Sequence, residues 1–448
     1  MAAKAWTYRG FPLRSDLWRV PLAMCGGAVL VFLITIGIDA AAAHQRIALP
    51  AWLSIGGIDD ARAILGAMLG AVSTVLALIF SVALLVLSMA ANMLGQRLMY
   101  RFIRDGITQV TIGLFLATFL QILLAFVVTR GGKIHTFVPQ VTLITSVLLT
   151  CASFGCLVVY SHRVAMSIQT DNVVARIVAD LDRLLILASH SWIMAAGRAR
   201  LVSAQPHSGE DHATLWRRCI DEGGRILATQ SGYLERIRYD ALITAAEQAK
   251  AVVRLAYRPG EFVMKGSVLA YVLPADRAAD LTNAVVEAVS IGKFRTLEQD
   301  LEFAIAQLVE IALRALSPAI NDTFTGIRCV DRLGDALREF AGIPTFDGVW
   351  RTPAGTMRLL ERPMQFPWLV KAAFDKIRQA AVGTPAVMIR MLETCARLAP
   401  FLTMPEHRKA LLDQVEAIWE SAAGASLVRV DRADVEAAYR TAQKALAA

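Results

Sequence analysis

Long apolar runs fill the first third of this chain, and charged or polar residues separate them. A helix that crosses a membrane needs about 20 predominantly apolar residues. Four segments satisfy that length, at Val20–Ala42, Arg62–Leu94, Ile107–Thr129 and Phe137–Tyr160. The first is too long and too well flanked to be a cleaved signal peptide. The pattern predicts an N-terminal tail at residues 1–19 and an all-α, four-helix transmembrane domain at residues 20–168.

The second apolar segment carries its small and polar residues on one side. With about 100° of rotation per residue, those of residues 62–96 fall within an arc of about 100°. Two interpretations follow. The arc packs on another helix, for which Gly66 and Gly70 form a small-xxx-small pattern, or it lines an uncharged pore with Leu84 as a hydrophobic constriction. The two interpretations are compatible in a homo-oligomer that has these helices around its axis. The pore hypothesis assigns as lining residues Gly70, Thr74, Ala77, Ser81, Leu84, Ser88 and Asn92.

Ionisable residues are missing from the depth of all four segments, and Asp39 stands at the outer end of the first. Proton- or sodium-coupled carriers need such groups near the middle of the membrane to bind the coupling ion. Their lack argues against a coupled transporter. Hydroxyl side chains are plentiful instead on the third and fourth segments, where they predict packing between helices.

Lysine and arginine residues are distributed unequally between the two sides of the predicted domain, eight against four. Because the cytoplasmic side carries the excess, both termini are predicted to lie in the cytoplasm. The cytoplasmic residues include Arg97, Arg101 and Arg104. Around the mouth of a pore, these three would favour anions.

The remainder of the chain resembles an ordinary charged polypeptide, and it predicts a cytosolic α+β domain. We expect a linker helix and a loop at residues 169–222, a β-rich module at 223–275 and a helical part at 276–448. The spacing of valines and turn glycines in the β-rich module is similar to that of lipoyl- and biotinyl-type barrel-sandwich modules. Neither Lys250 nor Lys265 stands in the tight hairpin that holds the modified lysine of those carriers, so no covalent cofactor is expected.

The densest polar motif of the chain lies between two predicted helices in the cytosolic part. Pro318 cannot continue a helix, and Asn321 or Asp322 is suited to cap the next one. In a structural interpretation, arginines of the motif pair with its aspartates. In a functional one, they form with a helix N-terminus an anion site for a nucleotide or phosphate. Both interpretations concern Arg295, Asp300, Arg314, Ser317, Asn321 and Asp322.

Together with other short motifs, this segment resembles a bacterial family of predicted membrane proteins known as domain of unknown function 2254. The family signature has the form RT-x(3)-D followed by ALSPxIND, which the chain matches at Arg295–Asp300 and Ala315–Asp322. Thr323 stands where a proline is common in the family. The resemblance covers nearly the whole chain, and it implies four membrane helices and a cytosolic domain without supplying an activity.

Composition narrows the function further. The 448 residues are 56% hydrophobic and carry a formal charge of +8, which suits contact with an anionic membrane surface or ligand. The sequence has no dense block of basic residues, so binding to nucleic acid is not expected. The six cysteines show no metal-binding spacing, and we recognise no catalytic motif, so neither an enzyme nor a bound cofactor is expected.

The function predicted from these observations is a homo-oligomeric passive ion channel that is gated by its cytosolic domain. The alternative is a membrane-anchored sensor or scaffold whose cytosolic domain binds an anionic small-molecule regulator or a partner protein. A weaker third hypothesis is an enzyme that acts on a membrane or anionic substrate at the cluster of Arg295, Asp300, Asn321 and Asp322.

Overall fold

The computed structural model describes residues 18–45, 57–94, 106–130, 138–167, 174–175, 177–187, 212–343, 346–352 and 355–447. The chain divides into two compact units, Met1–Asn172 and Val173–Ala448. Each unit is described here by itself.

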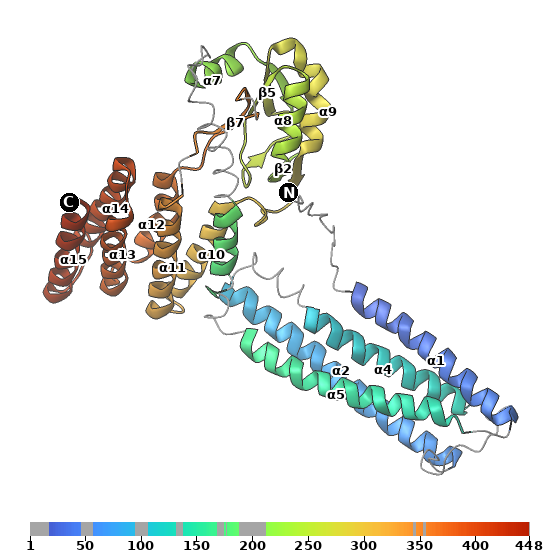
Figure 1. The fold of residues 1–448 in the computed structure, drawn as a ribbon. Coiled ribbons are helices and arrows are strands. Elements are labelled where there is room, and N and C mark those ends of the chain that lie inside the picture. Colours follow the sequence, from blue (N-terminus) through green and yellow to red (C-terminus); the bar gives the residue numbers. More distant parts are fainter. Residues whose placement is uncertain are drawn as a thin grey trace, which may run out of the picture. The chain divides into compact units, whose positions relative to one another are not determined.

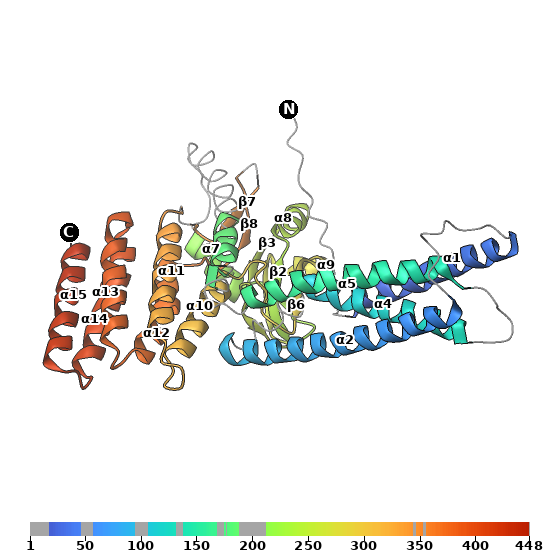
Figure 2. The same ribbon diagram turned by 90° about the horizontal axis from the view of Figure 1, so that it is seen from below.

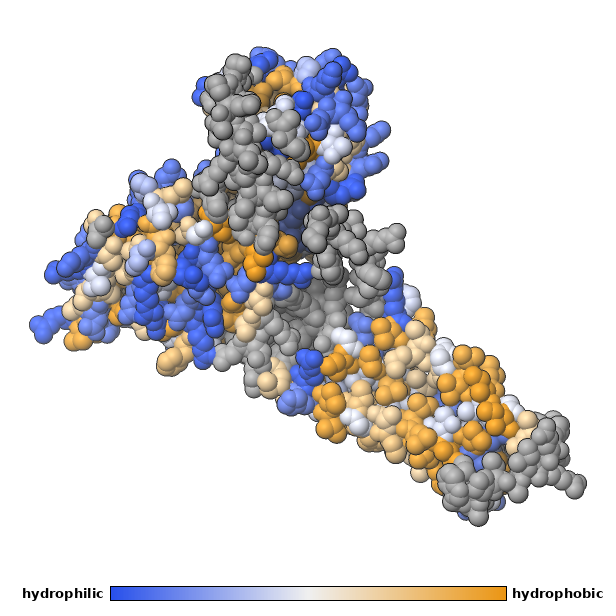
Figure 3. All heavy atoms as spheres, viewed as in Figure 1, coloured by the Kyte–Doolittle hydropathy of each residue, from blue (hydrophilic) through white to orange (hydrophobic). Residues whose placement is uncertain are grey.

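The first unit holds four long apolar helices, as predicted (Figure 1). They are α1 (Arg19–Gln45), α2 (Ile58–Leu94), α4 (Gly106–Arg130) and α5 (Gln140–Ser167). Helix α4 is the central one and packs against the other three. The outer surface of this unit is largely hydrophobic (Figure 3), which matches a lipid environment.

Two polar side chains join the helix ends of this unit. Asp39, near the end of α1, accepts hydrogen bonds from the backbone nitrogens of Val141 and Thr142, each at 2.9 Å, and from the Thr142 hydroxyl at 2.7 Å. It therefore caps the first turn of α5 from another helix. Arg62 of α2 donates two hydrogen bonds to the Thr129 carbonyl at the end of α4, at 2.9 and 2.7 Å. A carboxylate suits a helix N-terminus, and a guanidinium suits a C-terminus.

The second unit contains two sheets. The five-stranded sheet has the order β1-β5-β3-β8-β7, and the three-stranded sheet has the order β4-β2-β6. All neighbours are antiparallel except β3 and β8, which are parallel. The strands are β1 (Gly224–Leu227), β2 (Gly232–Ile237), β3 (Val252–Leu255), β4 (Phe262–Val263), β5 (Val268–Leu273), β6 (Val289–Gly292), β7 (Val349–Arg351) and β8 (Met357–Leu360).

One hydrophobic core joins both sheets to two helices. Its residues come from strands β1 to β8 and from two helices, α8 (Tyr239–Gln248) and α9 (Ala278–Ala288). On the opposite face of the five-stranded sheet, Leu215 and Cys219 of α7 (His212–Asp221) pack against Val349 and Leu360. Helix α7 thus occupies the last residues of the segment 169–222, for which the sequence indicated a linker helix and a loop.

Three strands lie beyond residue 275, where the sequence indicated only helices. Strands β6, β7 and β8 are three or four residues long, which is too short for a period of two to stand out. Strands β6 and β8 pair with β2 and β3 of the predicted β-rich module, and β7 pairs with β8. The mixed α+β class is therefore observed, while the barrel-sandwich arrangement is not confirmed and stays a prediction.

The last part of the unit is a stack of three helical hairpins. Helices α10, α12 and α14 pack side by side in one row, and α11, α13 and α15 in the other (Figures 1 and 2). Short 3-10 turns lie at Ala275–Arg277 and Ala399–Phe401. The helices are α10 (Leu301–Ala315), α11 (Thr323–Ala341), α12 (Phe366–Ala380), α13 (Pro385–Leu398), α14 (Pro405–Ala423) and α15 (Arg429–Ala447).

Candidate functional site

Helix α2 turns its small and polar side away from its neighbours. Its fully buried positions, Ala61, Leu65, Val72 and Ile79, face the bundle core. By contrast, Leu84 is 66% exposed. The predicted lining positions with described side chains are all exposed, namely Gly70, Thr74, Ala77, Ser81, Leu84 and Ser88. Within one chain, this side of α2 therefore does not serve the packing of the four helices.

The exposed side of α2 follows a regular spacing. One set of its exposed positions alternates between steps of four and three residues, which is the repeat of two helices that pack in a left-handed coil, while Ala71, Leu78, Phe80 and Leu85 are exposed beside this set. We call this set the outward face of α2, and it consists of Ala63, Ala67, Gly70, Thr74, Ala77, Ser81, Leu84 and Ser88. A search for polar residues misses Ala63 and Ala67, although the heptad spacing is visible in the sequence.

Within the part of the chain that the structure describes, the polar groups of this face form no hydrogen bonds to other helices. The Thr74 hydroxyl donates to the Gly70 carbonyl of its own helix at 2.9 Å. A Cβ atom built on Gly70 would meet nothing within 4 Å, whereas one on Gly66 would touch Phe126 of α4 at 3.7 Å. Gly66 therefore packs inside the bundle, and Gly70 leaves open space outside it. The Asn92 side chain and residues Arg97, Arg101 and Arg104 lie outside what the structure describes.

Two hydroxyls of α4 are used in contacts with α5, while Ser146 and Thr150 of α5 donate to carbonyls of their own helix. Thr118 and Ser153 share a hydrogen bond of 2.8 Å, and Thr111 lies 3.2 Å from the sulfur of Cys156. This confirms that they serve packing. Gln121 of α4 differs, because it is fully buried and neither amide atom has a partner among the described residues.

In the second unit, Arg295 and Asp300 form a closed pair. Arg295 donates to the two carboxylate oxygens at 2.7 and 2.9 Å. Asp300 also accepts from the Phe303 nitrogen at 2.9 Å and so caps α10. Gly260, at φ +92°, backs onto this carboxylate, which a Cβ atom would overlap. The close approach of the Gly260 turn therefore requires glycine there.

The other four motif residues build the turn between α10 and α11. Asp322 accepts a hydrogen bond from the Thr325 nitrogen at 3.0 Å and caps α11. Of the two residues that were predicted to cap this helix, Asn321 and Asp322, it is therefore Asp322 that does so. Asn321 adopts a φ of +50°, which asparagine tolerates better than most residues. The Ser317 hydroxyl donates to the Arg314 carbonyl at 2.7 Å, and Arg314 pairs with Glu310 at 3.8 Å.

Helix α10 separates these two groups. Asp300 precedes its first residue and Arg314 lies in its last turn, so about 20 Å of helix lies between them at 1.5 Å per residue. The six motif residues therefore do not form one site, which corrects the expectation that both arginines and both aspartates meet. The sequence cannot show this, because it does not reveal that the two segments cap opposite ends of one helix.

A buried carboxyl outside any predicted motif joins three elements. Glu361, directly after β8, accepts from the Tyr239 hydroxyl of α8 at 2.9 Å and from the Trp350 indole nitrogen of β7 at 2.8 Å. Burial raises the pKa of Glu361 from 4.5 to about 7, although both donors and the nearby Arg258 oppose the rise. Arg258 itself is 6% exposed and stacks on Trp368, with 3.8 Å between its guanidinium carbon and the ring centre.

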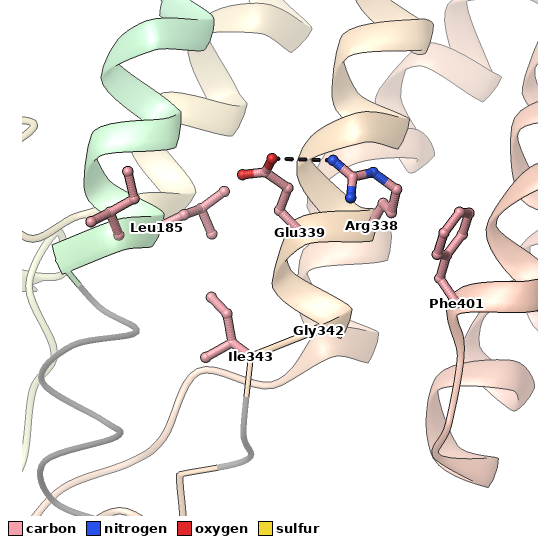
Figure 4. A pocket seen from close by; sticks show the side chains of 7 residues that line it. Leu185, Arg338, Glu339, Gly342, Ile343 and Phe401 are labelled. Atoms are coloured by element: carbon pink, nitrogen blue, oxygen red, sulfur yellow. Dashed lines mark hydrogen bonds and ion pairs between the residues drawn. The ribbon is translucent and has the colours of Figure 1, made fainter.

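A pocket of about 370 Å³ lies beside α11 (Figure 4). Leu185 from residues 177–187 and Ile343 from the end of α11 supply apolar walls, and Phe401 lies across from them. Arg338 and Glu339 form an ion pair of 3.1 Å at this pocket. The lining suits an apolar group, and the arginine is already paired.

Metal ligands and reactive thiols do not gather in the described part of the chain. No group of three His, Cys, Asp or Glu side chains there could hold a metal ion. All six cysteines are free. Burial raises the pKa of the Cys329 and Cys395 thiols to about 12, which leaves both unreactive.

Comparisons with known proteins agree with the membrane helices. A family model described as a predicted membrane protein, DUF2254, matches residues 14–397. Uncharacterised proteins of Mycobacterium tuberculosis and Mycobacterium bovis are similar to the chain, each with 27% identity over 394 residues that cover 85% of this chain and 71% of the relative. No solved structure matches.

Proposed function

The chain belongs to the DUF2254 family of predicted membrane proteins, and from that premise we propose that it is a homo-oligomeric passive ion channel whose pore is lined by the outward face of α2. The carrying observation is that this face, made of small and hydroxyl side chains, is exposed in the single chain. Small residues in membrane helices let a second helix approach closely. Hydroxyl groups offer polar contacts along a water-filled path.

The heptad spacing of the outward face supports an assembly around α2. Copies of α2 that pack side by side in a left-handed coil would keep this face toward a common axis over eight positions. Leu84 is the large residue among small ones, so a ring of its side chains would narrow the path and expel water. Among the described residues of the spans, the buried carboxylate of Asp39 lies near the end of α1 and is bonded to the first turn of α5, which favours passive over coupled transport.

In this proposal the chain lies in the bacterial inner membrane. Both termini are in the cytoplasm, because the excess of lysine and arginine marks that side. Arg97, Arg101 and Arg104 would then surround the cytoplasmic mouth and favour anions. The second unit would act as the gate. Only six residues separate the end of α5 at Ser167 from the helical residues that resume at 174, so a motion of that unit has a short covalent path to the membrane.

Single-channel recording of the purified chain in planar bilayers tests this proposal. Leu84→Ser should enlarge the currents or hold them open, because it makes the constriction polar. Leu78→Ser is the matched control, since Leu78 is 60% exposed but lies about 70° away from the centre of the outward face. Equal effects of both variants would refute a pore along this face.

Ion substitution then tests the arginines. Arg97→Glu combined with Arg101→Glu should weaken or reverse a preference for anions, and an unchanged preference would remove that part of the proposal. If the oligomer is folded and all variants are silent, the sensor or scaffold alternative replaces the channel. Ser81→Leu would then disturb assembly without affecting any conductance.

A further inference from the structure

The three-stranded sheet exposes an apolar surface at one end. In β4, Phe262 is 52% exposed, Val263 is buried, and Met264 just beyond the strand is 63% exposed. Because side chains alternate between the faces of a strand, Phe262 and Met264 share the outward face of this sheet. Tyr233 of β2 pairs with Phe262 in the ladder, and their rings meet edge to face with centres 5.2 Å apart.

The third strand brings another aromatic ring to the same end. Gly292, the last residue of β6, also pairs with Tyr233, so the chain leaves β6 at the end of the sheet where β2 begins and β4 stops. Lys293 and Phe294 follow directly, and Phe294 is 58% exposed. The three apolar side chains leave on the order of 300 Å² in contact with solvent. That area is in the range of the largest apolar patch on a typical monomeric protein, and such a patch is often functional.

Two lysines flank these apolar side chains. Lys265 follows Met264, Lys293 precedes Phe294, and both are exposed. Neither ammonium group forms an ion pair with any residue that the structure describes. We call Phe262, Met264, Lys265, Lys293 and Phe294 the tip patch. On this face, the carboxylate of Glu235 lies beside Gly292 and accepts a hydrogen bond from the Ser290 hydroxyl.

We propose that the tip patch docks on the surface of an anionic lipid bilayer. Aromatic rings and a flexible methionine suit the boundary between headgroups and acyl chains, and lysines attract anionic headgroups. The four apolar helices of the same chain keep the second unit within reach of a membrane. A second copy fits less well, because a two-fold contact of the patch with itself would bring lysines close to lysines.

Photo-crosslinking of the full chain tests this docking. Phe262 is replaced by the photoreactive analogue benzoylphenylalanine, and the protein is reconstituted into vesicles of phosphatidylcholine alone or mixed with phosphatidylglycerol. We expect a lipid adduct by mass spectrometry, with a higher yield in the mixed vesicles. Lys265→Glu and Lys293→Glu should each lower that yield about fivefold at low salt, and neither exposed change should disturb folding.

Phe401 provides the control, because it is 51% exposed in the same unit and its cationic neighbour, Arg338, is already held in ion pairs. Equal lipid yields at positions 262 and 401 would show random collision and overturn the proposal. An adduct with a second copy would reassign the tip patch to a subunit contact. A lipid yield that changes neither with phosphatidylglycerol nor with the lysine variants would refute the role of charge. The absence of any adduct would refute docking.

Discussion

The buried carboxyl of Glu361 should make the second unit less stable as the pH rises. An acid with a raised pKa binds its proton more tightly in the folded state than in the unfolded state. Its stabilising contribution is therefore complete below the unfolded pKa of 4.5 and is lost between there and the folded pKa of about 7. At 1.36 kcal/mol for each pKa unit, the loss is about 3 kcal/mol.

Glu361→Gln removes this dependence and keeps the shape. The amide of glutamine resembles the protonated acid, since its oxygen accepts from Trp350 and its nitrogen donates to the Tyr239 oxygen. Between about pH 5.5 and pH 8, the native chain should lose about 2 kcal/mol of local stability that the variant retains. His407 acts in the opposite direction, because burial lowers its pKa, and it cancels in the difference between the two proteins.

Hydrogen exchange read by mass spectrometry on the full chain in detergent measures this difference in β7 and β8, after correction for the intrinsic effect of pH. Tyr239→Phe is an informative second variant. It removes one donor to the carboxylate, so the pKa of Glu361 should rise further and the loss of stability should extend to higher pH. Parallel pH curves for the native chain and Glu361→Gln would refute the reasoning.

Two further predictions concern helix contacts. Asp39→Asn should lower the free energy of unfolding in mixed detergent micelles by about 2 kcal/mol, because it weakens the charge-assisted bonds to Val141 and Thr142; an unchanged unfolding midpoint would show that the cap is dispensable. Gly334→Ala should cost about 1–3 kcal/mol, because its Cβ atom would overlap the buried methyl group of Thr394 in α13. Thr394→Ser removes that methyl group, so the double variant should recover part of the loss in thermal unfolding, and strict additivity would contradict the contact.

The membrane helices could be predicted from the sequence within a few residues, because a long apolar run has few alternative structures. Their ends were harder. Helix α2 begins at Ile58 rather than at Arg62, since Asp59 and Asp60 suit its first turn. Helix α5 continues to Ser167, past the apolar run that was predicted to end at Tyr160.

The contacts of the second unit could not be predicted, because they join residues that are distant in the chain. Tyr239 and Glu361 are 122 positions apart, and the parallel pairing of β3 with β8 spans a similar separation. Local patterns indicated a cap at Asn321 or Asp322, but neither the cap at Asp300 nor the separation of the two aspartates by α10. The outward direction of the small-residue face of α2 likewise depends on which side α4 occupies.

The bond between Asp39 and α5 has a consequence for the biogenesis of the membrane unit. The backbone donor on Val141 lies 102 positions after the carboxylate, so the ribosome releases α1 long before the groups that satisfy Asp39 exist. During that interval, the first helix carries an acidic group that must stay near water. Insertion of the fourth helix ends this exposure, and so a chain truncated after α4 would keep an unsatisfied carboxylate that quality-control proteases could distinguish from the finished protein.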